Sequence, residues 1–173
     1  MGEKVEPVAT DYGAIIRLLA NGEIDFILIG GLAAIAHGLA LHTLDVDVVY
    51  SRKKENIQRL VAALAPTQPY LRGAPPGLPF RFDEKTVDMG LNFTLRTAIG
   101  DVDLLGEVAG GGTYEQLLPF ANEATGYGVR IKIVQLDKLI ALKRAAGRTK
   151  DNEVIAQLEA LRQEKRKLEA EGS

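Results

Sequence analysis

Two carboxylates and a pair of glycines are the residues of this sequence whose types and spacing best suit chemistry. Asp45 and Asp47 alternate with valines, so an extended chain places both carboxylates on the same face. Adjacent carboxylates repel each other, and a divalent cation between them removes that repulsion. Gly30 and Gly31 precede an alanine-rich segment, and a helix that starts on glycines offers free N–H groups to a phosphate. The pattern predicts a metal ion beside a phosphate-binding turn.

A third carboxylate with the same character follows downstream. Asp103 lies between Val102 and Leu104, in the alternation of a strand with one polar face. Asp101 directly follows Gly100, where an aspartate is common because it suits a turn. We therefore expect Asp103, rather than Asp101, to join the first two carboxylates.

These residues need elements that hold them in place, and the hydrophobic pattern supplies candidates. The run 26–29 is apolar and short enough for a buried strand, with a helix expected over 32–39 and a second strand from Asp45. Further strands are expected at 91–97 and 99–105 and in a hairpin at 124–134. Helices are expected at 11–20 with Thr10 as the N-cap, and at 51–65, 136–146 and 150–170.

The proline-rich segment, the residues after it and the charged C-terminal run have expectations of their own. Residues 66–79 hold five prolines and two glycines, which predicts a long irregular loop, either a binding loop or an exposed linker. Residues 80–82 and 87–89 are expected to form short strands. The charged run near the C-terminus, 162–167, is expected to be a solvated helix face.

Composition bounds the class of protein. The chain has 173 residues, of which 46% are hydrophobic and 25% charged, as in ordinary globular proteins. We expect one domain over 1–173, with a core at about 10–135 and a helical segment at about 136–170. The net charge of −2 argues against a broadly basic nucleic-acid surface, and the lack of cysteine excludes disulfides and thiolate chemistry.

Targeting signals are not evident. The N-terminal residues lack the apolar core of a signal peptide, and the apolar run 26–41 is broken by glycines and a histidine. This run is also shorter than the roughly 20 residues that a membrane-spanning helix needs. The simplest interpretation is a cytoplasmic protein without a membrane partner.

Several motifs together resemble a known family. They are the segment 29–33 with its Gly30-Gly31 turn, His37-Gly38, Thr43, the Asp45-Val46-Asp47 strand, and the Lys-rich helix and turn at 139–151. The combination resembles the nucleotidyltransferase superfamily with the polymerase-beta-type fold. Within it, the chain is similar to bacterial minimal nucleotidyltransferases related to the AbiEii-type toxins, over roughly residues 24 to 161.

The resemblance implies an α+β fold in which helices flank a mixed β-sheet and further helices follow at the C-terminus. It also implies catalysis by Asp45, Asp47 and Asp103, which would hold two Mg²⁺ or Mn²⁺ ions. The nucleoside triphosphate would contact the glycine turn and other residues, namely Gly30, Gly31, Thr43, Lys143, Arg148 and Lys150. Two positions depart from the family, which often has Arg where Leu41 stands and Asp where Val154 stands.

Two functions remain open at this point. The first is an enzyme that moves a nucleoside monophosphate from a nucleoside triphosphate to a hydroxyl on RNA or protein, as a toxin with a cognate antitoxin would. The second is a catalytically impaired module of the same fold that binds nucleotides or a partner. The three carboxylates favour the enzyme, whereas Leu41 and Val154 favour the module. His37 is expected to be a packed, hydrogen-bonded histidine rather than a catalytic base.

Overall fold

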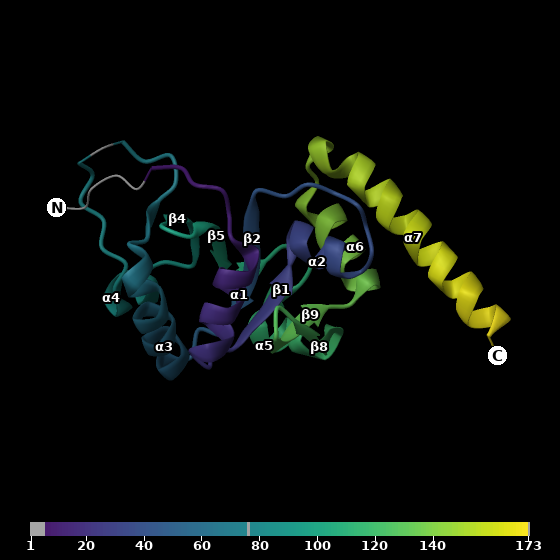
Figure 1. Ribbon diagram of the computed structural model, residues 1–173, viewed down its shortest axis with the longest axis horizontal. Coiled ribbons are helices and arrows are strands. Elements are labelled where there is room, and N and C mark those ends of the chain that lie inside the picture. Colours follow the sequence, from purple (N-terminus) through teal and green to yellow (C-terminus); the bar gives the residue numbers. More distant parts are fainter. Residues whose placement is uncertain (1–5, 76, 173) are drawn as a thin grey trace.

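A computed structural model describes residues 6–75 and 77–172 of the chain. Its centre is a seven-stranded mixed sheet with the strand order β3-β4-β5-β2-β1-β9-β8 (Figure 1). A separate two-stranded ribbon is formed by β6 (Glu107–Val108) and β7 (Gly112–Thr113). The expected α+β architecture with a mixed sheet and flanking helices is confirmed.

The middle of the sheet joins strands that are far apart in the sequence. β1 (Phe26–Ile29) pairs antiparallel with β2 (Asp45–Tyr50) and parallel with β9 (Val129–Val134). On its other side, β2 pairs parallel with β5 (Gly100–Leu105). The remaining pairs are antiparallel and continue the sheet to its two edges through β4 (Asn92–Thr97), β3 (Tyr70–Leu71) and β8 (Ala121–Gly126).

Helices cover the sheet and extend beyond it. α1 (Tyr12–Asn21) packs against β2, β5 and β9, with α3 (Lys54–Leu64) beside it. α2 (Gly30–Ala36) lies against β1 and β2 and contacts α6 (Leu136–Ala146). The short helices are α4 (Glu84–Met89), α5 (Tyr114–Leu117) and the 3-10 turns η1 (Ala65–Thr67), η2 (Leu118–Phe120) and η3 (Thr149–Asp151).

Burial explains why these segments fold as they do. All four residues of β1 are buried, which suits a central strand covered on both faces. In β5 buried residues alternate with partly buried ones, so the same strand sends Val102 and Leu104 into the core and its aspartates to the other face. The apolar stripe of α1, with Ile15, Ile16 and Leu19, is fully buried.

Most predicted elements are confirmed, but several details were wrong. Asp11, not Thr10, is the N-cap of α1, because its carboxylate accepts a hydrogen bond from the Ala14 N–H. The short strands expected at 80–82 and 87–89 are both absent: residues 80–82 have no regular structure, and 87–89 belong to α4, which Asp83 caps through the Thr86 N–H. The proline-rich segment is not wholly irregular, because it contains the two-residue strand β3.

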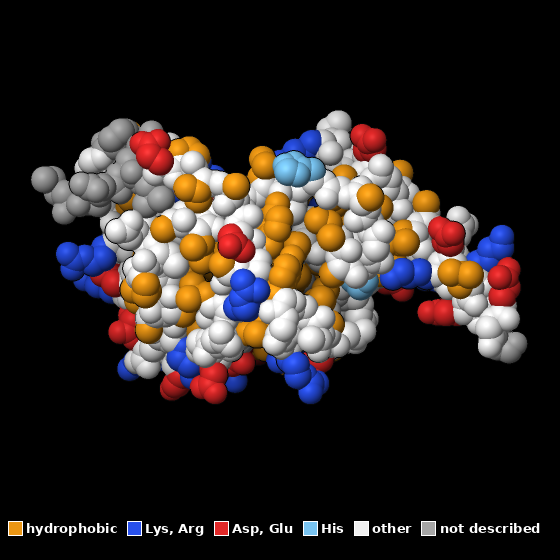
Figure 2. All heavy atoms as spheres, viewed as in Figure 1, with side chains coloured by type: hydrophobic (Ala, Val, Ile, Leu, Met, Phe, Trp, Pro, Cys, Tyr) orange, Lys and Arg blue, Asp and Glu red, His pale blue; other side chains and the backbone are white. Residues whose placement is uncertain are grey.

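α7 (Asn152–Glu171) is the last helix and projects away from the sheet (Figure 1). Arg162 and Arg166 tie it to α6 through Asp137, at N–O distances of 3.5 and 3.4 Å. Its outer part shows acidic and basic side chains next to each other (Figure 2), as expected of a solvated helix face. Across the described residues, every helix is too short or too polar to be a candidate for crossing a membrane.

Candidate functional site

The register of β2 and β5 brings the predicted carboxylates together. Parallel pairing sets Asp45 beside Asp101 and Asp47 beside Asp103, and all four are partly buried. Asp45, Asp47 and Asp103 each offer an oxygen, and these oxygens lie within 4.8 Å of one another. The three aspartates chosen from alternation therefore converge at one point of the sheet. We call the four residues the aspartate cluster.

Asp101 was wrongly expected at a turn. It lies inside β5, and its carboxylate belongs to the same face as that of Asp103. Its partners are arginines: Arg72 Nε lies 3.2 Å from one oxygen and Arg96 Nε 3.6 Å from the other. Asp101 is thus the member of the aspartate cluster most fully compensated by protein charge.

The two glycines make room for polar side chains of the site. A Cβ at Gly30 would lie 2.1 Å from Oδ2 of Asp47, and a Cβ at Gly31 would lie 2.7 Å from Oγ1 of Thr43. Gly30 also has a φ of +71°, which side chains rarely tolerate. The glycine turn therefore lets α2 begin directly against the carboxylate of Asp47.

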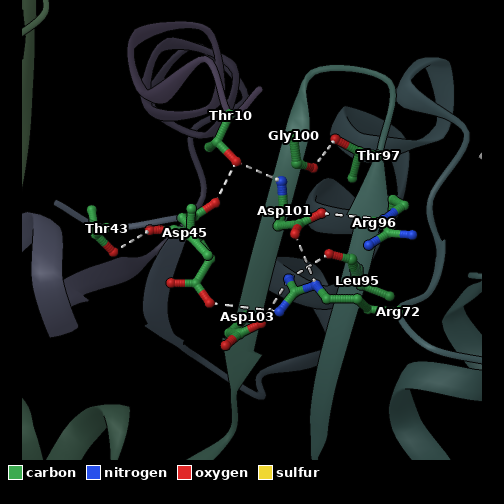
Figure 3. Close-up of polar contacts among 11 residues, drawn as sticks. Thr10, Thr43, Asp45, Arg72, Leu95, Arg96, Thr97, Gly100, Asp101 and Asp103 are labelled. Carbon is green, nitrogen blue, oxygen red and sulfur yellow. Dashed lines mark hydrogen bonds and ion pairs between the residues drawn. The ribbon is translucent and has the colours of Figure 1, made fainter. Parts of the chain in front are cut away.

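Further contacts fix the loop before β2. The Thr10 hydroxyl donates to the Leu44 carbonyl and accepts from the Asp101 N–H, so it joins the loop to β5 (Figure 3). The Tyr12 hydroxyl donates to the carbonyl of Thr43. Together these bonds hold the end of the loop that leads into Asp45.

Burial and mutual repulsion disfavour the charged form of two of the carboxylates. Burial, followed by the negative charges of Asp45 and Asp103, raises the pKa of Asp47 to about 8, and the Lys143 ammonium opposes this only in part. Burial and Asp103 also raise the pKa of Asp45, although Arg72 opposes them. A divalent cation would relieve this repulsion and favour the ionised carboxylates.

The donor set fits a hard cation. Asp45, Asp47 and Asp103 provide carboxylate oxygens, which Mg²⁺ and Mn²⁺ prefer, and partial exposure leaves access for the water ligands that Mg²⁺ retains. Because position 30 is a glycine, it adds no side chain next to the Asp47 carboxylate.

Arg72 is the most prominent residue that the sequence prediction missed. It follows β3 and points its guanidinium into the aspartate cluster (Figure 3). Nη2 lies 3.0 Å from Asp103 Oδ1 and Nη1 3.5 Å from Asp45 Oδ2, in addition to the contact with Asp101. The proline-rich segment therefore contributes directly to the site.

Basic side chains approach from α6 and the turn after it. Buried Asp151 holds two of them, with Arg148 Nε at 2.6 Å and Lys143 Nζ at 3.9 Å. Lys143 is itself largely buried, whereas Lys150 is exposed beside the same turn. Asp151 belongs to the quoted Arg148-Thr149-Lys150-Asp151 motif, but its role in fixing two cations was not predicted.

One cavity of about 690 Å³ connects these groups. Its lining includes every residue that the sequence analysis assigned to the site, from Gly30, Gly31 and Thr43 to the three aspartates and Lys143, Arg148 and Lys150. Leu41 and Val154, the two departures from the resembled family, also line it. The volume is that of an ordinary small-molecule site.

The two histidines differ in their surroundings. His37 Nε2 lies 2.7 Å from the Val134 carbonyl, which confirms a packed, hydrogen-bonded histidine at the end of α2. His42 is exposed and lines the cavity.

Comparisons with known proteins give a family-model match and a structural match. Residues 88–171 match the model of a family described as "Nucleotidyl transferase of unknown function (DUF2204)". This part of the chain contains Asp103, Lys143, Arg148 and Lys150, while the glycine turn and the Asp45–Asp47 strand lie before it. No curated protein matches the sequence.

A solved structure is similar over most of the chain. It is the crystal structure of a protein from Thermotoga maritima described as a "putative nucleotidyltransferase", and 12% of the aligned residues are identical. The TM-score is 0.54, and the match covers 85% of this chain and 91% of the other. The chain has a nucleotidyltransferase fold. The aspartate cluster and the cavity beside it therefore lie within a fold that is shared with a protein described as a "putative nucleotidyltransferase".

Proposed function

We propose that the protein is a metal-dependent nucleotidyltransferase that moves a nucleoside monophosphate from a nucleoside triphosphate to a hydroxyl on RNA or protein. The main support is that carboxylates suited to a metal ion and cations suited to phosphate line one cavity. Nucleotidyl transfer needs both, because the metal neutralises charge on the phosphates while protein cations hold the leaving pyrophosphate.

The residues have distinct tasks in this proposal. Asp45, Asp47 and Asp103 would hold Mg²⁺ or Mn²⁺. Asp103 would also accept the proton of the attacking hydroxyl. Lys143 and Arg148, both fixed by Asp151, bind the phosphates, and exposed Lys150 lies at the same wall. Thr43 and the N–H groups at the start of α2 provide uncharged contacts to phosphate.

A second cavity offers a path for the acceptor. It has a volume of about 650 Å³ and shares Asn92, Glu107, Val108 and Ala109 with the first cavity. The glycines at 110–112 line it, so backbone rather than bulky side chains forms much of its wall. An acceptor hydroxyl entering here would approach the β5 side of the aspartate cluster.

A transfer assay tests the function directly. We expect label from one of the four α-labelled nucleoside triphosphates to appear on cellular RNA or protein when Mg²⁺ or Mn²⁺ is present, and not with Asp103→Asn. The nucleotide with metal should also raise the melting temperature, because a ligand of the folded state stabilises it. Absence of both effects with all four nucleotides would contradict the proposal.

The impaired module is the second candidate, and it is favoured by the apolar Leu41 and Val154 in the cavity wall. It predicts the melting-temperature shift without label transfer. The toxin role implied by the resemblance predicts in addition that expression of the protein slows growth and that a cognate antitoxin prevents this.

Leu41→Arg should tighten nucleotide binding. Leu41 lines the cavity, and an arginine there could donate a charge-assisted hydrogen bond to phosphate, worth about 1.5–3 kcal/mol and hence roughly 10-fold or more in affinity. Calorimetry with a non-hydrolysable triphosphate measures the change. Leu118→Arg is the control, because it adds the same charge at a partly exposed leucine outside the cavity lining. Equal affinity of the two variants would mean that position 41 does not face phosphate.

A further inference from the structure

Arg72 occupies a place in the site that resembles the place of a cation. Its guanidinium faces one oxygen each of Asp45, Asp101 and Asp103, and its side chain is 20% exposed. Asp47 has no ion pair of this kind among the described residues. We propose that Arg72 takes the position of a second metal ion, so that the aspartate cluster binds one divalent cation instead of two. This inference rests on the proposed metal-dependent function.

The sheet anchors Arg72 from behind. The backbone N–H of Arg72 donates to the Thr94 carbonyl at 3.0 Å, and its side-chain Nη2 donates to the Leu95 carbonyl at 2.7 Å. Both acceptors belong to β4, the neighbour of β5. Arg72 is therefore bonded to the sheet that carries the aspartates both through its backbone and through its guanidinium.

Tyr70, two residues before Arg72, strengthens this attachment. The ring of Tyr70 packs edge-on against Phe80 with a centroid distance of 6.0 Å, and its hydroxyl is 3.1 Å from the carbonyls of Pro75 and Leu78. Tyr70 is buried. These contacts hold the chain on both sides of Arg72 and oppose withdrawal of its side chain.

Arg72 supplies charge to the aspartates rather than ordinary hydrogen bonds. Its Nε and Asp103 Oδ1 are buried and have no hydrogen-bond partner among the described residues, although both lie within ion-pair distance of opposite charges. The guanidinium orientation is thus set by the Leu95 carbonyl, while its charge offsets the carboxylates, as a metal ion would.

The charge balance leaves room for one ion. The aspartate cluster has four carboxylates, and two guanidinium groups, those of Arg72 and Arg96, contact it. Two negative charges remain when all four are ionised, which equals the charge of one divalent cation. Asp45 and Asp103 each have one oxygen facing Arg72 and a second oxygen left, and Asp47 has both.

Counting bound Mn²⁺ by equilibrium dialysis tests the inference without measuring activity. The intact protein, with a non-hydrolysable triphosphate analogue, should bind one Mn²⁺ per bound analogue. Arg72→Gln should bind two, and Arg72→Lys should return to one because it restores the charge. Arg96→Gln removes the same amount of charge, but Arg96 pairs only with Asp101, which is not one of the three proposed metal ligands. It does not open a place between Asp45 and Asp103, so its count should stay at one.

Each result decides between the two proposals. Two Mn²⁺ in the intact protein, one in Arg72→Gln, or two in Arg96→Gln would overturn the role of Arg72 and leave the nucleotidyltransferase function standing. No Mn²⁺ and no analogue bound by any form would overturn both. The count on the intact protein remains decisive even where circular dichroism shows that Arg72→Gln does not fold.

Discussion

Replacing Asp47 with asparagine should make the metal-free protein more stable at neutral pH and at the same time remove its stabilisation by metal and its transfer activity. The reason is that Asp47 lies against Asp45 and Asp103 and has no ion pair with a basic residue in the described part of the chain. Asparagine keeps the shape and removes the charge. We expect a gain of roughly 1–3 kcal/mol at pH 7, since one pKa unit is worth about 1.4 kcal/mol and the buried amide keeps part of the desolvation cost.

The effect should depend on pH with a definite sign. The pKa of Asp47 in the folded protein is raised to about 8, mainly by burial, above an unfolded value of about 3.9. Between these values the folded state keeps a proton that the unfolded state releases, so stability of the metal-free parent falls as pH rises through this window. The difference between Asp47→Asn and the parent should be small near pH 4, grow with pH, and level off above about 8.

Asp101→Asn is a matched control in the same cluster. Asp101 faces Arg72 and Arg96, so its loss leaves two guanidinium groups with less compensation and should destabilise the protein with or without metal. Urea unfolding of the parent and both variants, with and without Mg²⁺ and a triphosphate analogue, measures the effects. If Asp47→Asn is destabilised like Asp101→Asn in both conditions, Asp47 holds the fold together and is not a metal ligand.

Gly30→Ala should cause the largest loss of stability among single-methyl changes at the site. The new Cβ would lie 2.1 Å from Asp47 Oδ2, and the φ of +71° is unfavourable for alanine. Left-handed strain costs about 1–2 kcal/mol and overpacking about 1–3 kcal/mol, so we expect a loss of roughly 2–5 kcal/mol together with weaker metal binding. The midpoint of urea unfolding should fall while the slope stays the same.

Gly128→Ala separates strain from collision. Gly128 has a similar φ of +79°, but a Cβ there would meet nothing within 4 Å, so this variant should lose only the strain. Combining Gly30→Ala with Asp47→Ala should cost less than the two single changes together, because the colliding carboxylate is gone. Equal losses for Gly30→Ala and Gly128→Ala would show that the close approach to Asp47 is unimportant for stability.

Much of the site could be predicted from sequence because strand alternation determines which side chains share a face. Asp45, Asp47 and Asp103 needed only the pattern of their apolar neighbours, and parallel pairing of β2 and β5 then brought them together. Asp101 was misplaced because a glycine before an aspartate suits a turn as well as the first residues of a strand.

Arg72 could not be predicted in the same way. The strand before it, β3, is two residues long and lies within a proline-rich segment without periodicity, so only the pairing of this segment with β4 defines the position of Arg72. The helix at 84–89 was missed for a different reason, because its apolar content is low and its Asp83 cap was overlooked. Both errors concern short segments whose structure depends on tertiary contacts or on a single cap.

Pairing of β2 with β5 affects the order in which the chain can fold. Asp45 meets Asp101 only after a segment of 56 positions has closed, so this contact carries a loop-closure cost that the β4–β5 and β8–β9 hairpins do not. Repulsion within the aspartate cluster adds to that cost until β3 brings in Arg72. The strand pair that assembles the site is therefore expected to form late, and mildly acidic conditions, which protonate aspartates, should shorten the delay.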